Sequence, residues 1–475
     1  MRKIVLCCLL ALVACGGGLR AQVGTNLYYM DFVPQQSANN PAFKAPYDFY
    51  FGFPGLSGLH AQLHNDAFSW SNLIERGVDD SLRFNVGKTV GRLHNRNLIG
   101  AEITEEILRF GFKKGENYFH LGLSAKVDAN VVLTKPLLSF LLLGPGQFLG
   151  ENHFKHNAID ATAYAYLYFG WSRKISDMVT VGARVKLING LYNATTKKLG
   201  ITWNVLNDDL ADPTLSPYTY ELKVDGEIRT NLLGQDFKWN GLSFSDFYKN
   251  WGFGIDMGVI VDFAPNWRFT ASALDLGAIF WKDHNANVFH SRNDSVNYPF
   301  QGLDELNVFG EGIRFDSLIS RAVTRIVDTL NFERDTNYRK GYTTMLPTTL
   351  TIGFDYTLLE QHRFGLMFKG RLLNNYFSAD VGIAYTYTPC KNFAVSVSNT
   401  FGNSGPLNLG FAIAGNLGPV QLHLGVDRIN SFNVAKMRTA SVTFGINFVI
   451  GKYEIHPSKL AYIRAEKAAA QNMEY

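Results

Sequence analysis

The sequence predicts an all-β fold, a transmembrane antiparallel β-barrel of about 14–16 strands with a plug-like N-terminal segment and a loop helix. Three observations predict it. Apolar and polar residues alternate one by one over long segments, tight turns separate these segments, and the chain begins with a secretory leader. Because successive side chains of a strand point to opposite sides, each segment has one apolar and one polar wall.

The alternation is most regular between residues 350 and 450. In the stretch 376–388, Phe377, Val381 and Tyr385 share the apolar face, whereas Asp380 lies on the polar face. This pattern fits either a soluble barrel or sandwich with an apolar interior, or a membrane barrel with an apolar exterior. Strands that span a membrane need roughly 9–11 residues and a polar face toward a wet lumen. Several segments meet both conditions, so the membrane barrel is favoured over the soluble alternative.

The composition agrees with a membrane barrel. The 475 residues carry a formal charge of +4, and the mean hydropathy of −0.05 is near neutral because each apolar residue is matched by a polar one. The 44 Gly, 36 Phe and 22 Tyr residues fit bending strands and aromatic girdles. After the N-terminus no apolar run reaches the about 18 residues of a helical span, and the best stretch, 131–143, is broken by Lys135 and Pro136. The balanced charge gives no indication of a nucleic-acid partner.

The N-terminus has the pattern of a secretory signal. Arg2 and Lys3 precede an apolar core at 4–14, and cleavage is expected after Ala21. The alternative is lipidation at Cys15, because residues 12–15 are similar to a bacterial lipobox. Either route takes the protein out of a bacterial cytoplasm, so we expect the barrel in the outer membrane. With Cys390 the mature chain has at most two cysteines, which excludes a disulfide framework.

The chain is predicted to have four parts, with the barrel as the largest. They are a signal peptide at 1–21, an irregular segment and possible plug at 22–46, the barrel at 47–450 and a periplasmic tail at 451–475. In the first half of the barrel, the expected elements are strands in 47–63, a short helix in 84–94, strands at 108–112 and 119–127, a hairpin over 161–187 and a hairpin over 253–281.

The order of turns predicts the orientation of the barrel. If the last strand ends in the periplasm, the short turns fall on the periplasmic side and the long connections fall outside, as in outer-membrane barrels. The short turns are 174–177, 264–267, 359–361 and 389–391, and the long connections are 129–157, 231–252 and 283–347.

One segment in the longest connection has helical spacing. Its apolar residues recur every three or four positions over 315–331. Its expected role stays open between a helix packed on the barrel rim, a cap over the outer mouth, a plug in the lumen and a docking element for a partner.

Charged residues on the polar strand faces are the candidate functional residues. They could line an ion-selective channel, but buried charges need partners, so pairing across a filled interior is favoured. Their mixed signs argue against a strong selectivity filter. The candidates are Lys126, Asp128, Arg184, Lys186, Asp256, Asp355, Lys369, Arg371, Asp380 and Asp427.

The motifs of enzymes and metal sites are weak or missing in the sequence. His153 and His156 have a metal-like spacing, but no HExxH glutamate accompanies them. There is no GxSxG elbow, and a triad from His423 and Ser441 would need adjacency that the sequence cannot show. We therefore expect no enzymatic activity, no cofactor and no metal.

Short motifs resemble two families of barrels. Asn40-Pro41-Ala42 resembles a motif near the start of FadL-type fatty-acid transporter barrels. The stretches 26–30, 50–57, 251–258 and 273–282 resemble an uncharacterised family of outer-membrane proteins from the Bacteroidota, and this resemblance runs over most of the mature chain. It implies a fold and a location but no chemistry. The tail after Gly451 extends beyond the usual end of such barrels at the last strand.

Two functions follow as hypotheses. The first is FadL-like passage of hydrophobic small molecules, with lipid and a hydrophobic ligand as partners. The second is a non-transporting barrel that scaffolds or shuttles secretion or surface proteins, suggested by the long connections at 231–252 and 283–347.

Overall fold

The computed structural model describes most of the predicted barrel. The described residues are 24–76, 82–143, 147–207, 218–231, 250–282, 286–291, 296–297, 332–335, 340–373, 376–402, 407–431, 433 and 436–451. The predicted signal peptide with Cys15, the helix at 315–331 and the tail from residue 452 lie outside them. No helix of the described residues is long and apolar enough to cross a membrane.

Within the described residues, fourteen wall strands close into an antiparallel barrel, which confirms the predicted fold class and the lower end of the predicted strand count. The first wall strand is in two pieces, β1 (Phe49–Gly52) and β2 (Gly58–Asn65), and both pair with β5 and β23, which closes the barrel. The other wall strands are β5 (Arg96–Lys114), β6 (Asn117–Thr134), β8 (Ala158–Lys174), β9 (Val179–Asn207), β11 (Trp251–Ala264), β12 (Trp267–Trp281), β17 (Thr348–Leu358), β18 (His362–Leu373), β19 (Tyr376–Cys390), β20 (Phe393–Phe401), β21 (Leu409–Leu417), β22 (Val420–Ile429) and β23 (Thr439–Ile450).

The two ends of the barrel differ. Short turns join β5 to β6, β8 to β9, β11 to β12, β17 to β18, β19 to β20 and β21 to β22 at one end, here called the turn end. The predicted short turns lie there, with one correction: β19 continues through Cys390, so its turn is 391–392 rather than 389–391. At the opposite loop end, β6 runs to Thr134, so the predicted connection 129–157 begins only at Lys135.

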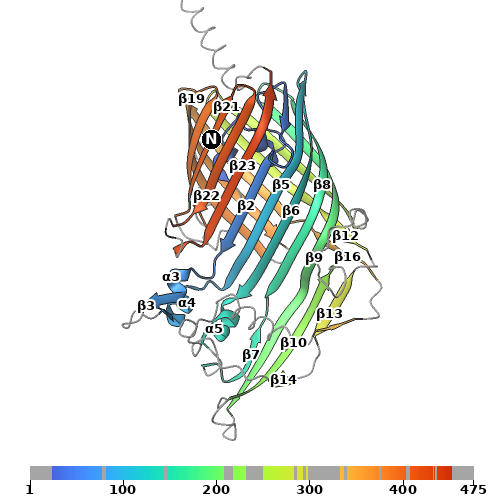
Figure 1. Cartoon of the computed structure of the whole chain (residues 1–475), viewed down its shortest axis with the longest axis vertical. Helices are drawn as coiled ribbons and strands as arrows, with labels where there is room; N and C mark the ends of the chain where they lie inside the picture. Colours follow the sequence, from blue (N-terminus) through green and yellow to red (C-terminus); the bar gives the residue numbers. More distant parts are fainter. Residues whose placement is uncertain are drawn as a thin grey trace, which may run out of the picture.

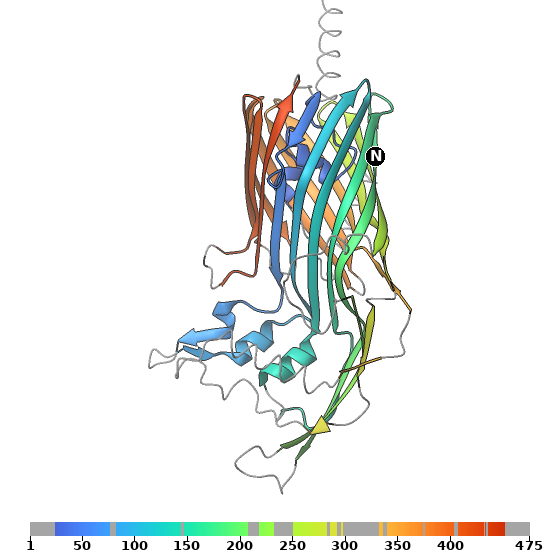
Figure 2. The same cartoon turned by 45° about the vertical axis from the view of Figure 1, so that its right-hand side comes forward.

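Strands and helices continue beyond the barrel at the loop end (Figures 1 and 2). The far half of β9 pairs with β7 (Gly150–Phe154) and β10 (Tyr218–Thr230). The other elements there are α3 (Trp70–Leu73), β3 (Ile74–Arg76), β4 (Leu82–Phe84), α4 (Val86–Arg92), α5 (Lys135–Leu143), β13 (Asn287–Ser291), β14 (Val296–Asn297), β15 (Phe332–Arg334) and β16 (Tyr342–Met345). Together these elements form the loop-end extension, and α4 lies within the helix predicted at 84–94.

The barrel has its apolar side chains outside and its charges inside. Phe377 and Ile352 are 52% and 42% exposed, whereas Lys369 is 4% and Asp380 3% exposed. A soluble barrel would bury the first two residues and expose the others. The observed distribution excludes the soluble alternative and is the arrangement of barrels whose outer wall meets lipid.

Residues 24–47 lie inside the lumen near the turn end, where Figure 2 shows them as the dark blue segment within the barrel. The segment contains two short helices, α2 (Thr25–Tyr28) and η1 (Pro34–Ala38). Almost every residue of it is buried, including Tyr28, Met30 and Phe32 at 1–2% exposure. The described part of the predicted 22–46 segment therefore fills the lumen at this level.

Two glycines let the segment approach the barrel wall. A Cβ atom at Gly182 in β9 would overlap the Pro41 carbonyl, and one at Gly258 in β11 would overlap the Asn40 side chain. Gly182 and Gly258 are paired across β9 and β11, so together they form a flat patch under Asn40 and Pro41. The wall is thus shaped to the Asn-Pro-Ala turn of the segment.

The close approach at Gly182 is testable with Gly182→Val. The added side chain needs the space of the Pro41 backbone, and overpacking of this kind costs about 1–3 kcal/mol. We expect a lower guanidinium midpoint in detergent micelles and faster tryptic cleavage after Lys44, because the segment leaves its seat. Gly87→Val in α4, where nothing lies within 4 Å of the added Cβ, is the matched control. Equal cleavage of both variants and the wild type would contradict the close packing.

Candidate functional site

All ten predicted charged residues lie on the inner side of the barrel. Nine of them are buried, and Lys126 is half-buried with its side chain 11% exposed. They come from strands on all sides of the lumen. The residues are Lys126 and Asp128 in β6, Arg184 and Lys186 in β9, Asp256 in β11, Asp355 in β17, Lys369 and Arg371 in β18, Asp380 in β19 and Asp427 in β22.

Glu102 in β5 is the centre of one group of ion pairs. Its Oε1 lies 3.2 Å from the Lys126 Nζ, and its Oε2 lies 3.1 Å from the Arg371 Nη1. Arg371 also forms an ion pair with Asp128. Because β18 lies far from β5 and β6 in the sheet, the two ion pairs of Arg371 join opposite walls of the lumen.

Asp256 in β11 is the centre of a second group. The Lys186 Nζ lies 2.9 Å from Asp256 Oδ1, and the Arg184 Nη1 lies 3.5 Å from Asp256 Oδ2. Asp275 in β12 pairs with Lys186 and lies 3.6 Å from the Lys126 Nζ. Asp275 therefore connects the two groups into one network of alternating charge.

A third group fixes the N-terminal segment to the wall. Asp31 of the segment forms an ion pair with Arg363 in β18, and its Oδ1 lies 3.5 Å from the Arg268 Nη1 in β12. Each arginine also contacts a carboxylate of the barrel wall. Arg363 lies 3.5 Å from Asp355, and Arg268 lies 3.0 Å from Asp262. Asp31 thus adds a negative charge between two buried arginines.

Further hydrogen bonds hold the segment on several other strands. Asn26 Nδ2 donates to Asp427 Oδ1 at 2.6 Å, and Gln35 Nε2 donates to Asn447 Oδ1 at 2.9 Å. The Tyr28 hydroxyl and the Thr270 hydroxyl lie 2.8 Å apart. Burial raises the pKa of Tyr28 to about 12, against the opposing effect of this hydrogen bond, so its hydroxyl stays protonated at physiological pH.

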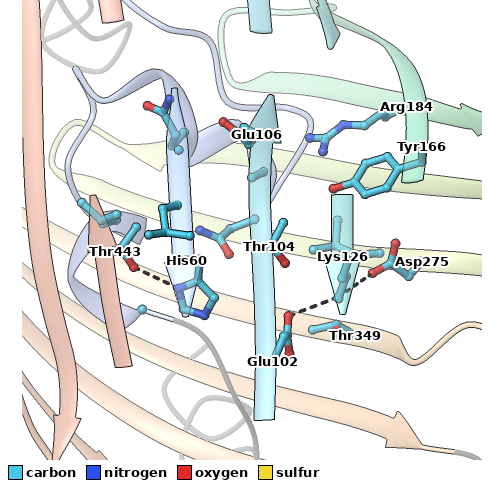
Figure 3. A pocket seen from close by; sticks show the side chains of 18 of the residues that line it. His60, Glu102, Thr104, Glu106, Lys126, Tyr166, Arg184, Asp275, Thr349 and Thr443 are labelled. Carbon is cyan, nitrogen blue, oxygen red and sulfur yellow. Dashed lines mark hydrogen bonds and ion pairs between the residues drawn. The ribbon is translucent and has the colours of Figure 1, made fainter. Parts of the chain in front are cut away.

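A cavity of about 140 Å³ lies beside the segment, deeper toward the loop end. The volume is comparable to that of an engineered cavity of roughly 150 Å³ that binds benzene. Leu27, Leu59 and Leu274 supply apolar lining. The charged lining consists of the cations Lys126, Arg184, Lys186, Lys369 and Arg371 and the acids Glu102, Glu106 and Asp275. In Figure 3, Lys126 lies between Glu102 and Asp275, while His60 contacts Thr443 at 2.9 Å.

Several residues of the site were not among the predicted ones. Arg268 and Arg363 continue the polar faces of β12 and β18, so the alternation alone could have identified them. Glu102 and Glu106 lie in a part of β5 that was not predicted as a strand. Asp275 and Arg428 have positive φ of 59° and 61° at irregular points of pairing, which turn them inward against the alternation.

The other predicted positions have simpler surroundings. His153 Nδ1 lies 3.0 Å from the Thr202 hydroxyl at the loop end, and the described residues hold no group of three His, Cys, Asp or Glu side chains that could hold a metal ion. Cys390 is an exposed free thiol. His423 is buried, at 1% exposure, and Ser441 donates to the Asp427 carbonyl at 3.2 Å.

The fold and site define a closed antiparallel β-barrel with an apolar outer wall, a charged lumen and its own N-terminal segment inside. The family described as "Family of unknown function (DUF5723)" matches residues 41–427. The chain belongs to this family. The matched residues include most of the wall and the residues that seat Asn40 and Pro41, but leave out most of the segment itself.

Comparison with solved structures finds other barrels at low identity. The toluene transporter TbuX of Ralstonia pickettii is 12% identical with a TM-score of 0.40, and the match covers 89% of this chain and 95% of that one. A FadL homologue of Pseudomonas aeruginosa is 10% identical with a TM-score of 0.40, covering 92% of this chain and 100% of that one. No curated protein matches the sequence.

The ion pairs of Arg371 make the charge network testable. In Arg371→Met, Asp128 and Glu102 both lose a buried partner, and breaking a buried pair costs about 3–5 kcal/mol. We expect the free energy of unfolding, from guanidinium titrations in neutral micelles, to fall by this amount. Arg173→Met, at an exposed position of β8, is the control. An unchanged Arg371→Met variant would show that water, rather than Arg371, neutralises these carboxylates.

Proposed function

We propose that the protein is an outer-membrane barrel whose N-terminal segment acts as a plug and gates the passage of small molecules. The observation that carries this proposal is the segment itself, which fills the lumen at the turn end and leaves a cavity of about 140 Å³ behind it. A molecule that enters from the loop end would reach the cavity and stop at the plug. Passage would then require the plug to move.

The outer wall supports the membrane location. Apart from the first wall strand, which is in two pieces, the wall strands have 9–29 residues, long enough for the roughly 9–11 that a membrane strand needs. Apolar side chains such as Ile352, Phe364 and Phe377 cover the outside. The turn end would face the periplasm, because short turns are typical of the periplasmic side.

The lining of the cavity favours molecules with both apolar and polar parts. Leucines contribute apolar surface, but charged side chains surround the same space. A purely apolar molecule would displace water from these charges without replacing its hydrogen bonds, which costs free energy. We therefore narrow the hypothesis of hydrophobic passage to small amphipathic molecules. Most charged groups of the lumen are engaged in ion pairs, and the proposal assigns the lumen no enzymatic chemistry.

The loop-end extension supports a second candidate function, a non-transporting barrel that docks other proteins. It has two hydrophobic clusters of its own, one around Phe140 and Trp203 and one around Leu73 and Leu138. A connection that only closed a loop would not need such packing. Crosslinking of the intact protein in cells should then recover one stoichiometric partner at this extension.

The membrane location predicts the effect of a charge on the outer wall. In Ile352→Arg, the new guanidinium would lie against lipid, at a cost of about 2–4 kcal/mol near the bilayer centre. We expect a smaller folded fraction in vesicles, measured by the heat-dependent shift on electrophoresis. Leu359→Arg, in the exposed turn between β17 and β18, should fold like the wild type. Equal folding of both variants would contradict lipid contact at position 352.

The gating role predicts that a loosened plug passes more solute. In Asp31→Ala, Arg363 and Arg268 lose their ion pairs with the segment. Arg363 keeps its hydrogen bond to the Tyr29 carbonyl at 3.3 Å, but the plug is held less tightly. We expect faster uptake of a small zwitterionic solute by proteoliposomes than with the wild type, in a swelling assay. Asp177→Ala, at the exposed Asp177–Lys174 pair of a short turn, is the control. If uptake in Asp31→Ala equals that in empty liposomes, the lumen is not a path.

A further inference from the structure

We propose that the lumen cavity is a binding site for a small organic monoanion, a carboxylate with an apolar body about the size of one aromatic ring. Lys369 would hold the carboxylate, and the leucines of the lining would pack against the body. The inference deepens the proposed function and rests on its plugged lumen, because Leu27 of the N-terminal segment lines the cavity.

The balance of charge around the cavity is the first argument. Five cations and three acids line it, and each of these acids already has a cationic partner. Glu102 is paired with Lys126 and Arg371, Glu106 with Arg109, and Asp275 with Lys126 and Lys186. The lining therefore has more positive charge than its own acids neutralise.

Lys369 is where this excess lies. It is 4% exposed and lines the cavity, yet among the described residues no carboxylate oxygen lies within 4 Å of its Nζ. Glu102, an acid that also lines the cavity, is engaged by Lys126 and Arg371. Asp380, its direct cross-strand neighbour, pairs with Arg428 instead. A buried ammonium needs a partner, and the cavity has room for an anionic one.

The size of the cavity and its apolar lining restrict the chemical class of the anion. A volume of about 140 Å³ is too small for a long chain and close to the roughly 150 Å³ that accommodates benzene. Leu27, Leu59 and Leu274 give the body of a ligand an apolar contact, which a bare inorganic anion would not use. An aromatic or short branched monocarboxylate matches both the charge and the apolar surface.

Calorimetric titration of the purified full-length protein in neutral micelles tests the site, with benzoate as the probe. Acetate tests binding of the carboxylate alone, and benzyl alcohol tests binding of the aromatic ring without the carboxylate. The heat of titrating each probe into empty micelles is subtracted. We expect saturable benzoate binding that is tighter than binding of either fragment. Because a charged hydrogen bond contributes about 1.5–3 kcal/mol, Lys369→Met should weaken benzoate by at least about tenfold.

Three further variants separate binding from folding. Lys369→Arg keeps the charge and should keep most of the affinity, and Lys369→Gln is a second neutral variant. Lys197→Met, at an exposed lysine of the loop-end extension, should bind like the wild type. Lys369→Met should be at least as stable as the wild type, because it removes a buried charge that has no carboxylate partner.

The outcomes are distinct. The site is wrong if the wild type shows no saturable benzoate binding, if Lys369→Met binds as tightly as the wild type, or if benzyl alcohol binds as tightly as benzoate. Binding of benzoate without uptake through Asp31→Ala supports the site and contradicts passage. Uptake without benzoate binding supports passage and contradicts the site.

Discussion

The structure depends on one constraint: a barrel with an apolar exterior must bring its charges inside, where they have to be neutralised. Each of the regular strands sends every second side chain into the lumen, and many of these side chains are charged. Charges in an interior of low polarity are costly unless paired. The pairs therefore run across the lumen, as between Arg371 in β18 and Glu102 in β5, and these contacts hold opposite walls at fixed distances.

The N-terminal segment completes this neutralisation. Arg109 donates to the Pro34 carbonyl at 3.1 Å, and Arg184 donates to the Ser37 carbonyl, so backbone oxygens of η1 serve as partners for wall arginines. In return, these contacts provide hydrogen-bond donors for backbone carbonyl groups of η1, a short helix that is not part of the barrel sheet. Asp31 adds the charged contact on the other side of the lumen. The wall and the segment thus each supply the polar partners that the other lacks.

The sequence predicted the fold well because the barrel repeats one local rule. Wherever pairing is regular, as from β17 to β19, the alternation alone assigns each residue to the inside or the outside. The rule fails at irregular points. An extra residue at Ile107 reverses the alternation in β5, so Glu102 and Arg109 both point inward although an odd number of positions separates them. Asp275 faces inward for a similar reason, through its positive φ.

The partners of each charge were beyond the sequence for a different reason. Which wall residue meets Arg371 or Asn26 depends on the curvature and closure of the whole barrel, and these contacts join residues more than 200 positions apart. The alternation places a charge in the lumen but does not say which charge faces it. The same limit applies to the N-terminal segment. Its irregular sequence has no periodicity that would predict where it lies in the lumen.

Arg371 and Lys369 show how this network separates structure from function. They are two residues apart on one face of β18, both are buried, and both carry a positive charge. Arg371 has two carboxylate partners, so its charge is used in holding the walls together. Lys369 faces the cavity, and its nearest cross-strand acid is bound to Arg428. A cation that the fold does not neutralise destabilises the empty protein, and this cost falls when an anion enters. An anion bound at Lys369 would therefore stabilise the folded protein by removing this cost.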